Sequence, residues 1–175
     1  MTDPSERLRQ VLELVAREDG HLQGVRERLF GETPMEAVDG AWVQRTLATP
    51  EGIDRTESFG AKFARMQDTV MDKLLPLFLT AAGEQPGAAI DNLNRAERLG
   101  LVRDAEAWVA MRRLRNRLVH EYIDRPDDMA PALRRARAFT DELHETFEGV
   151  REYLAARDLL GEDAALPPDT AWYDG

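Results

Sequence analysis

The chain has 175 residues, of which 43% are apolar, 32% charged and 7% aromatic, and its formal net charge is −10. This length suits one domain with a real core, and the absence of cysteine excludes disulfides, thiolate metal sites and a cysteine nucleophile. No apolar run approaches the ~18 residues of a membrane span. The N-terminus also lacks the basic-then-apolar pattern of a secretory signal, so we expect a cytoplasmic protein.

The N-terminal part of the chain is predicted to be helical. Apolar residues at helical spacing indicate a helix over 6–17 and a shorter one over 22–30, separated where residues 18–20 break the pattern. A third helix is expected over 33–47, because it opens with the Thr-Pro-Met-Glu order typical of a capped helix start. The Thr-Pro-Glu-Gly stretch at 49–52 is expected to end it.

The rest of the chain continues as longer helices. The longest is expected over 56–82, kinked or ended at Pro76, where proline removes an amide donor. Three more helices are expected over 88–99, 103–122 and 126–157. The composition is poor in the residues that strands prefer, so the predicted fold is an all-α antiparallel bundle.

The positive charge is concentrated, although the chain as a whole is acidic. A uniformly acidic surface would repel nucleic-acid phosphate, but a local field can still draw a charged ligand into a cleft. Alternatively, most of these arginines pair with the abundant carboxylates of neighbouring helices. The two groups are Arg112, Arg113, Arg115 and Arg117, and Arg134, Arg135 and Arg137.

Residues 115–122 read Arg-Asn-Arg-Leu-Val-His-Glu-Tyr and combine several chemically useful groups. Arg115 can hold a phosphate through its planar guanidinium, and the imidazole of His120 is suited to proton transfer near neutrality. Two histidines and fixed cations could cleave RNA without a metal. One imidazole would take the proton of the ribose 2′-hydroxyl and another would protonate the leaving 5′-oxygen, while arginine stabilises the charge on the phosphate.

A straight helix separates the two reactive groups. Arg115 and His120 lie about 140° apart around the helix axis, an awkward arrangement for two groups acting on one phosphate. Either the helix loosens near His120, or the site forms where two copies meet across a twofold axis, which would supply two histidines. Trp108, Leu114 and Leu118 are expected to face the core, with Arg115 and His120 exposed.

The same residues carry a family resemblance. Residues 115–122 match the R-x4-H-x-Y motif of the HepT toxins, within the HEPN superfamily of all-helical ribonucleases, and the chain resembles this family over roughly residues 55–156. The resemblance implies a homodimeric, metal-independent endoribonuclease without a cofactor, the toxin of a type VII-like toxin–antitoxin system, acting on RNA such as tRNA. The implied partner is a minimal nucleotidyltransferase antitoxin that attaches AMP to the motif tyrosine, here Tyr122.

The resemblance also implies roles and boundaries. Arg115 and His120 would form the catalytic pair. The HEPN-like bundle would span 54–157, after an N-terminal helical extension at 1–53 that is longer than the family leads us to expect. A flexible acidic tail is expected at 158–175. The supporting or RNA-binding residues would be Asn116, Arg117 and Arg112.

A second function stays open. In this alternative the chain is a non-catalytic helical binding or regulatory subunit of a nucleotidyltransferase, and the motif only holds a dimer together or presents Tyr122 for modification. No metal site is expected, because His21 and His144 have no short-range partner of ligand type. The chain is not expected to be the nucleotidyltransferase itself, since it lacks a Gly-Ser turn followed by an Asp-x-Asp strand.

Overall fold

The computed structural model describes residues 3–120 and 125–160, and within these ranges every regular element is a helix. The chain is an all-α helical bundle, which confirms the predicted fold class. Among the described helices, none combines the length and the apolar character needed to cross a lipid bilayer.

The first helix, α1 (Pro4–Phe30), is one element where the sequence predicted two. The break expected at residues 18–20 is absent. Gly20 is buried inside the helix, and Leu22 and Val25 continue the apolar stripe on its far side. Packing of this stripe in the core outweighs the cost of about 1 kcal/mol that a glycine adds to a helix interior.

The next helix, α2 (Gly40–Leu47), starts later than predicted. The sequence placed its start at Thr33, but only a short 3-10 helix, η1 (Met35–Ala37), forms there. The N-cap of α2 is instead Asp39, whose carboxylate accepts a hydrogen bond from the backbone N–H of Trp42 at 2.9 Å. This bond satisfies one of the unpaired amides at the helix start.

The long helical path predicted over residues 56–82 contains a local widening. α3 (Pro50–Thr69) is followed by a π-helical turn, η2 (Val70–Leu74), and then by α4 (Leu75–Ala81). The N–H that closes η2 bonds five residues back along the chain. Because Pro76 follows at once and has no N–H to donate, a regular α-helix could not continue unchanged through this point. The kink or end predicted at Pro76 takes the form of this turn.

The last three helices follow the predicted order. α5 (Ala89–Arg98) ends two residues before Gly100, whose φ of +80° is favoured by glycine. α6 (Ala105–His120) is preceded by Asp104, whose carboxylate accepts hydrogen bonds from the backbone amides of Glu106 and Ala107. α7 (Pro126–Ala156) is the longest helix of the described part.

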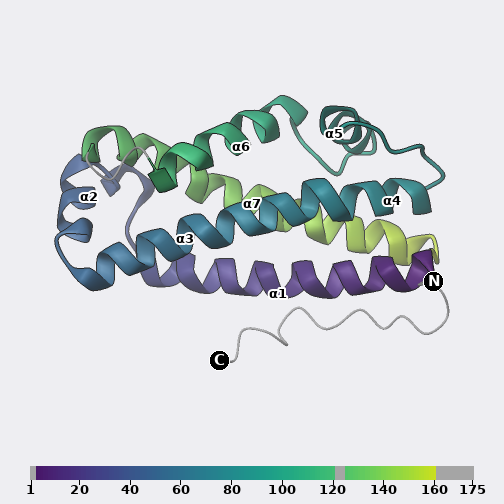
Figure 1. Ribbon diagram of the computed structural model, residues 1–175, viewed down its shortest axis with the longest axis horizontal. Coiled ribbons are helices and arrows are strands. Elements are labelled where there is room, and N and C mark those ends of the chain that lie inside the picture. The colour runs from purple at the N-terminus through teal and green to yellow at the C-terminus, as the bar shows by residue number, and fades with distance from the viewer. Residues whose placement is uncertain (1–2, 121–124, 161–175) are drawn as a thin grey trace.

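These helices form one bundle around one apolar core. α1 and α6 run in one direction, and α3, α4 and α7 run in the opposite direction (Figure 1). The domain boundary predicted between residues 53 and 54 falls inside α3, and the same core cluster includes Leu12 and Val25 of α1 together with Phe59 and Trp108. The arrangement places α6 across α3, and this contact positions the motif.

Candidate functional site

Residues 115–120 of the motif lie in the C-terminal half of α6. Asp104 fixes the start of the helix, and His120 is its last residue. The side chain of His120 and the whole of Tyr122 lie outside the described residues. The geometry of the site is therefore that of Arg112 to Leu118 and of the helix they contact, α3.

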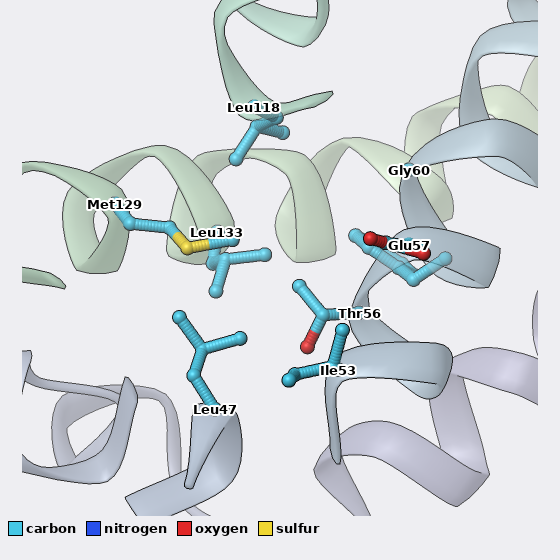
Figure 2. A pocket seen from close by; sticks show the side chains of 9 residues that line it. Leu47, Ile53, Thr56, Glu57, Gly60, Leu118, Met129 and Leu133 are labelled. Atoms are coloured by element: carbon cyan, nitrogen blue, oxygen red, sulfur yellow. The ribbon is translucent and has the colours of Figure 1, made fainter. Parts of the chain in front are cut away.

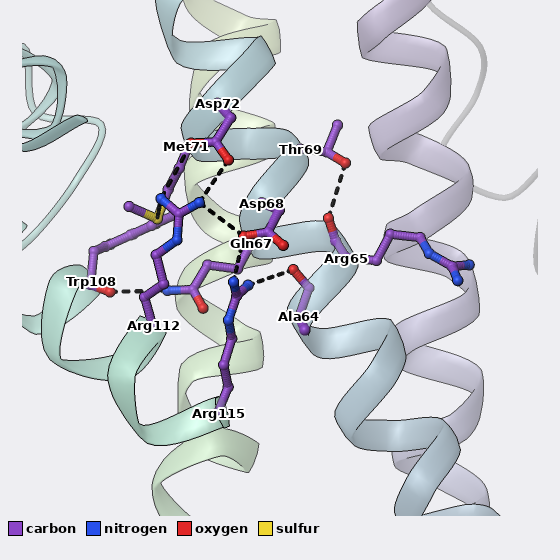
Figure 3. Close-up of polar contacts among 10 residues, drawn as sticks. All are labelled: Ala64, Arg65, Gln67, Asp68, Thr69, Met71, Asp72, Trp108, Arg112 and Arg115. Carbon is purple, nitrogen blue, oxygen red and sulfur yellow. Dashed lines mark hydrogen bonds and ion pairs between the residues drawn. The ribbon is translucent and has the colours of Figure 1, made fainter. Parts of the chain in front are cut away.

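Arg115 points towards α3 and is held there by two hydrogen bonds. Its Nη2 donates to Asp68 Oδ1 at 2.6 Å, and its Nη1 donates to the backbone carbonyl oxygen of Ala64 at 2.7 Å (Figure 3). Its Nε is buried and meets no acceptor among the described residues. Asp68 thus neutralises the guanidinium and fixes its direction.

Arg112 stands one turn earlier on α6 and binds the same face of α3. Its guanidinium forms a two-pronged ion pair with Asp72 at 2.7 and 3.2 Å, and a further contact of 3.1 Å with Asp68 (Figure 3). The hydrogen bonds that Arg112 donates to Asp72 are the largest cause that raises the pKa of Arg112 above its ordinary value. This arginine stays charged and forms part of the α3–α6 contact.

Two expectations about burial in this helix are wrong. Arg115 was predicted to be exposed, but only 7% of its surface is accessible, because Asp68 and Ala64 together offer it acceptors within the α3–α6 contact. Leu114 was predicted to be buried and is half-buried. Trp108 and Leu118 are buried as predicted, and Trp108 packs edge-to-face on Phe139 at a centroid distance of 5.1 Å.

The exposed face of the motif helix is polar and positively charged. Arg113, Asn116 and Arg117 are exposed there, whereas Arg112 and Arg115 face α3. The two groups follow from helix periodicity, since residues three apart share a face and neighbours do not. Of the predicted supporting residues, Asn116 and Arg117 are therefore accessible to a ligand, and Arg112 is engaged with carboxylates.

The acidic partners, Asp68 of α3 and Asp72 of η2, were not predicted as site residues. Asp68 and Asp72 are four residues apart, and Arg112 and Arg115 are three apart, so each pair presents one stripe of a single charge. This matching spacing is the signal in the sequence that could have identified them. The expectation that most arginines of the two groups pair with carboxylates holds for Arg112 and Arg115, whereas Arg134 and Arg137 donate to backbone carbonyls.

An apolar pocket of about 260 Å³ lies near the end of α6, between α2, α3 and α7 (Figure 2). Leu118 reaches it from the motif helix, and Leu133 and Met129 reach it from α7. Its polar groups are Glu57 and Thr56, and the Thr56 hydroxyl donates to the carbonyl of Gly52 at 2.8 Å. Since none of the described residues that line the pocket is a cation, its described lining does not suit a phosphate.

The other histidines of the chain lie far along the sequence from the motif. His144 on α7 places its Nδ1 2.8 Å from Oδ2 of the buried Asp19, which links α7 to α1. His21 is exposed on α1. Within residues 3–120 and 125–160, no three His, Asp or Glu side chains gather as metal ligands would.

No family model matches this chain, and neither a curated protein nor a solved structure does so. The class that the fold and the site define is an all-α bundle with a basic, polar stripe at the end of α6. Any more specific function has to be argued from these residues.

Proposed function

We propose that this protein is a metal-independent endoribonuclease, the toxin of a HepT-like toxin–antitoxin pair. One observation carries the proposal: residues 115–120 of the R-x4-H-x-Y motif form the C-terminal end of α6, which also carries the exposed Arg113, Asn116 and Arg117. These side chains can bind phosphate and sugar through charge-assisted hydrogen bonds. They also give RNA a local positive surface on a chain whose net charge is −10.

In the proposed reaction the ribose 2′-oxygen forms a bond to phosphorus while the bond to the 5′-oxygen breaks. His120 takes the proton of the 2′-hydroxyl, and His120 of a second copy protonates the leaving 5′-oxygen. The products are a 2′,3′-cyclic phosphate and a 5′-hydroxyl end. The scheme requires a homodimer through α6, because one chain supplies a single histidine in the motif.

Because Arg115 is buried, its role in the proposed reaction differs from the one that the resemblance implies. An arginine fixed by Asp68 and by a backbone carbonyl keeps only part of its hydrogen-bonding capacity for a phosphate. We therefore assign Arg115 to orienting the end of α6, and the direct phosphate contacts to Arg117 and Asn116.

The direct test is cleavage by the purified protein in the presence of EDTA. We expect a structured RNA such as tRNA to be cut at an unchanged rate after chelation, and the new ends to carry 2′,3′-cyclic phosphate, because internal attack needs only proton transfer and charge stabilisation. Gel analysis of end-labelled RNA, with and without acid treatment that opens the cyclic phosphate before a phosphatase removes it, measures both. Loss of cleavage on chelation that Mg²⁺ restores would refute the metal-independent reaction.

The proposed regulation acts on Tyr122. Attaching AMP to its hydroxyl would add bulk and a negative phosphate near the exposed arginines, and would block RNA by occupancy and by charge. Tyr122→Phe removes the attachment oxygen and keeps the ring, so this variant should stay toxic when a partner nucleotidyltransferase is co-expressed. The wild type should be silenced and gain the mass of one or more AMP units in intact-mass spectrometry. Equal silencing of both proteins would exclude Tyr122 as the switch.

One observation favours the second candidate, a non-catalytic helical binding or regulatory subunit. Arg115 is buried in an ion pair that stabilises the α3–α6 contact, which is what a purely structural arginine would do. In that case the chain binds its partner through the exposed face of α6 and cleaves no RNA. The cleavage assay separates the two candidates, since only the first predicts new RNA ends.

A further inference from the structure

A cationic groove runs between α1 and α4, on the part of the bundle away from the motif. It has a volume of about 550 Å³ and is lined by Arg7 and Arg17 of α1 and by Lys73 of η2. Its apolar lining includes Leu14 of α1 and Leu77 of α4. We call this surface the α1–α4 groove. It differs from its surroundings because positive charge predominates on a strongly acidic chain.

The acidic lining of the groove does not neutralise Arg7 and Lys73. Among the described residues that line it, Asp72 is the acidic one, and its carboxylate is already engaged by Arg112 at 2.7 Å. Glu18 lies buried close by, and Arg17 and Lys73 act on it electrostatically, but its carboxylate is turned into the protein and accepts a hydrogen bond from Thr69 at 3.0 Å. The groove therefore offers positive charge next to apolar surface, which suits a segment that is both acidic and apolar.

A second hollow connects this groove to the end of α7. This hollow, of about 260 Å³, is lined by Leu8 of α1 and by Leu159, and it shares Leu77 and Thr80 with the α1–α4 groove. The chain is anchored at the same end, because Arg9 donates a hydrogen bond to the carbonyl of Leu160 at 3.0 Å. Figure 1 shows the start of α1 and the end of α7 side by side there. The hollow and the groove thus form one path that starts where the described chain ends.

The residues that follow Leu160 have the matching chemistry. Residues 161–175 contain four carboxylates and no lysine or arginine, and they also carry Leu166, Trp172 and Tyr173. Fifteen extended residues reach about 50 Å, whereas Arg7 and Arg17 are only about 15 Å apart along the helix. We propose that residues 161–175 dock intramolecularly in the α1–α4 groove, with their carboxylates against its cations and their apolar side chains on its floor. This docking covers the groove against other polyanions, and it does not depend on the proposed ribonuclease activity.

The absence of cysteine makes the test clean in the full chain. Ala171→Cys, labelled with a nitroxide, should broaden the amide resonances of Gln10, Leu14 and Thr80 far more than those of α5 and α6. The broadening should fall severalfold at about 1 M NaCl, where the screening length is ~3 Å. Broadening that is spread evenly over the protein, or centred on another element, would overturn the proposal.

Two sets of charge variants test which residues hold the segment. Arg7→Gln with Lys73→Gln should reduce the broadening severalfold, whereas Arg113→Gln with Arg117→Gln removes the same charge from α6 and should leave it unchanged. Asp163→Asn with Asp169→Asn removes negative charge from the docked segment instead of positive charge from the groove. It should reduce the broadening by a similar factor and leaves the described helices unchanged in sequence. Equal broadening in all of these variants would overturn the proposal.

A mixed sample identifies which chain the segment belongs to. Nitroxide-labelled Ala171→Cys protein without ¹⁵N is mixed at equal concentration with ¹⁵N-labelled protein that has no cysteine and therefore carries no nitroxide. Intramolecular docking predicts no broadening in this sample. Broadening of the same groove residues there would mean that the segment docks on a second copy, which contradicts the intramolecular proposal.

Discussion

His120→Ala is expected to abolish toxicity and to slow RNA cleavage by about 10²- to 10⁴-fold, the contribution typical of a general acid or base. The effect is this large because the motif supplies one histidine per chain, and in the proposed dimer the substitution removes both proton-transfer groups. Growth after induced expression and the rate of tRNA cleavage by purified protein measure it.

The matched control is His21→Ala, which removes an exposed imidazole from α1 and should change neither readout. Arg115→Ala is a weaker test of catalysis than the sequence suggested, because its buried guanidinium also joins α6 to α3. Its loss of activity has to be compared with its loss of stability. Cleavage by His120→Ala at the wild-type rate would rule out the proposed reaction.

Asp68→Ala is expected to lower the free energy of unfolding by about 2–3 kcal/mol, because it leaves the charge of Arg115 buried without a carboxylate. Hydrogen bonds to charged groups contribute roughly 1.5–3 kcal/mol, and only the Ala64 carbonyl would remain as an acceptor. At about 2–4 °C per kcal/mol for a chain of this size, the Tm should fall by about 5–10 °C. Urea unfolding followed by circular dichroism measures the change.

Asp72→Ala provides the comparison. Its partner Arg112 is 31% exposed and keeps its contact with Asp68, so this substitution should cost no more than about 1 kcal/mol. The difference in the free energy of unfolding between Asp68→Ala and Asp72→Ala measures how much burial strengthens an arginine–aspartate ion pair. Equal destabilisation by both would mean that the burial of Arg115 does not determine the strength of its pairing with Asp68.

Local signals in the sequence were sufficient for the fold class and for much of the core. The spacing of apolar residues predicted the helices from residue 56 onwards in their order, and it placed Trp108 and Leu118 inside. The same local reasoning anticipated a disturbance at Pro76, since the missing N–H belongs to the residue itself. Features that depend on helix periodicity or on the backbone chemistry of one residue can be predicted from the local sequence.

Only the tertiary structure decided the features that depend on contacts between distant residues. α1 continues through Gly20 because Leu22 and Val25 pack in a core built from other helices. The burial of Arg115 depends on Asp68, 47 residues away, and helix periodicity alone cannot tell a solvated arginine from one that meets a carboxylate on the facing helix. The sequence by itself determined which side chains α6 carries, and the packing of α6 on α3 decided which of them face solvent, because burying a charge is tolerated only where a partner charge is already in place.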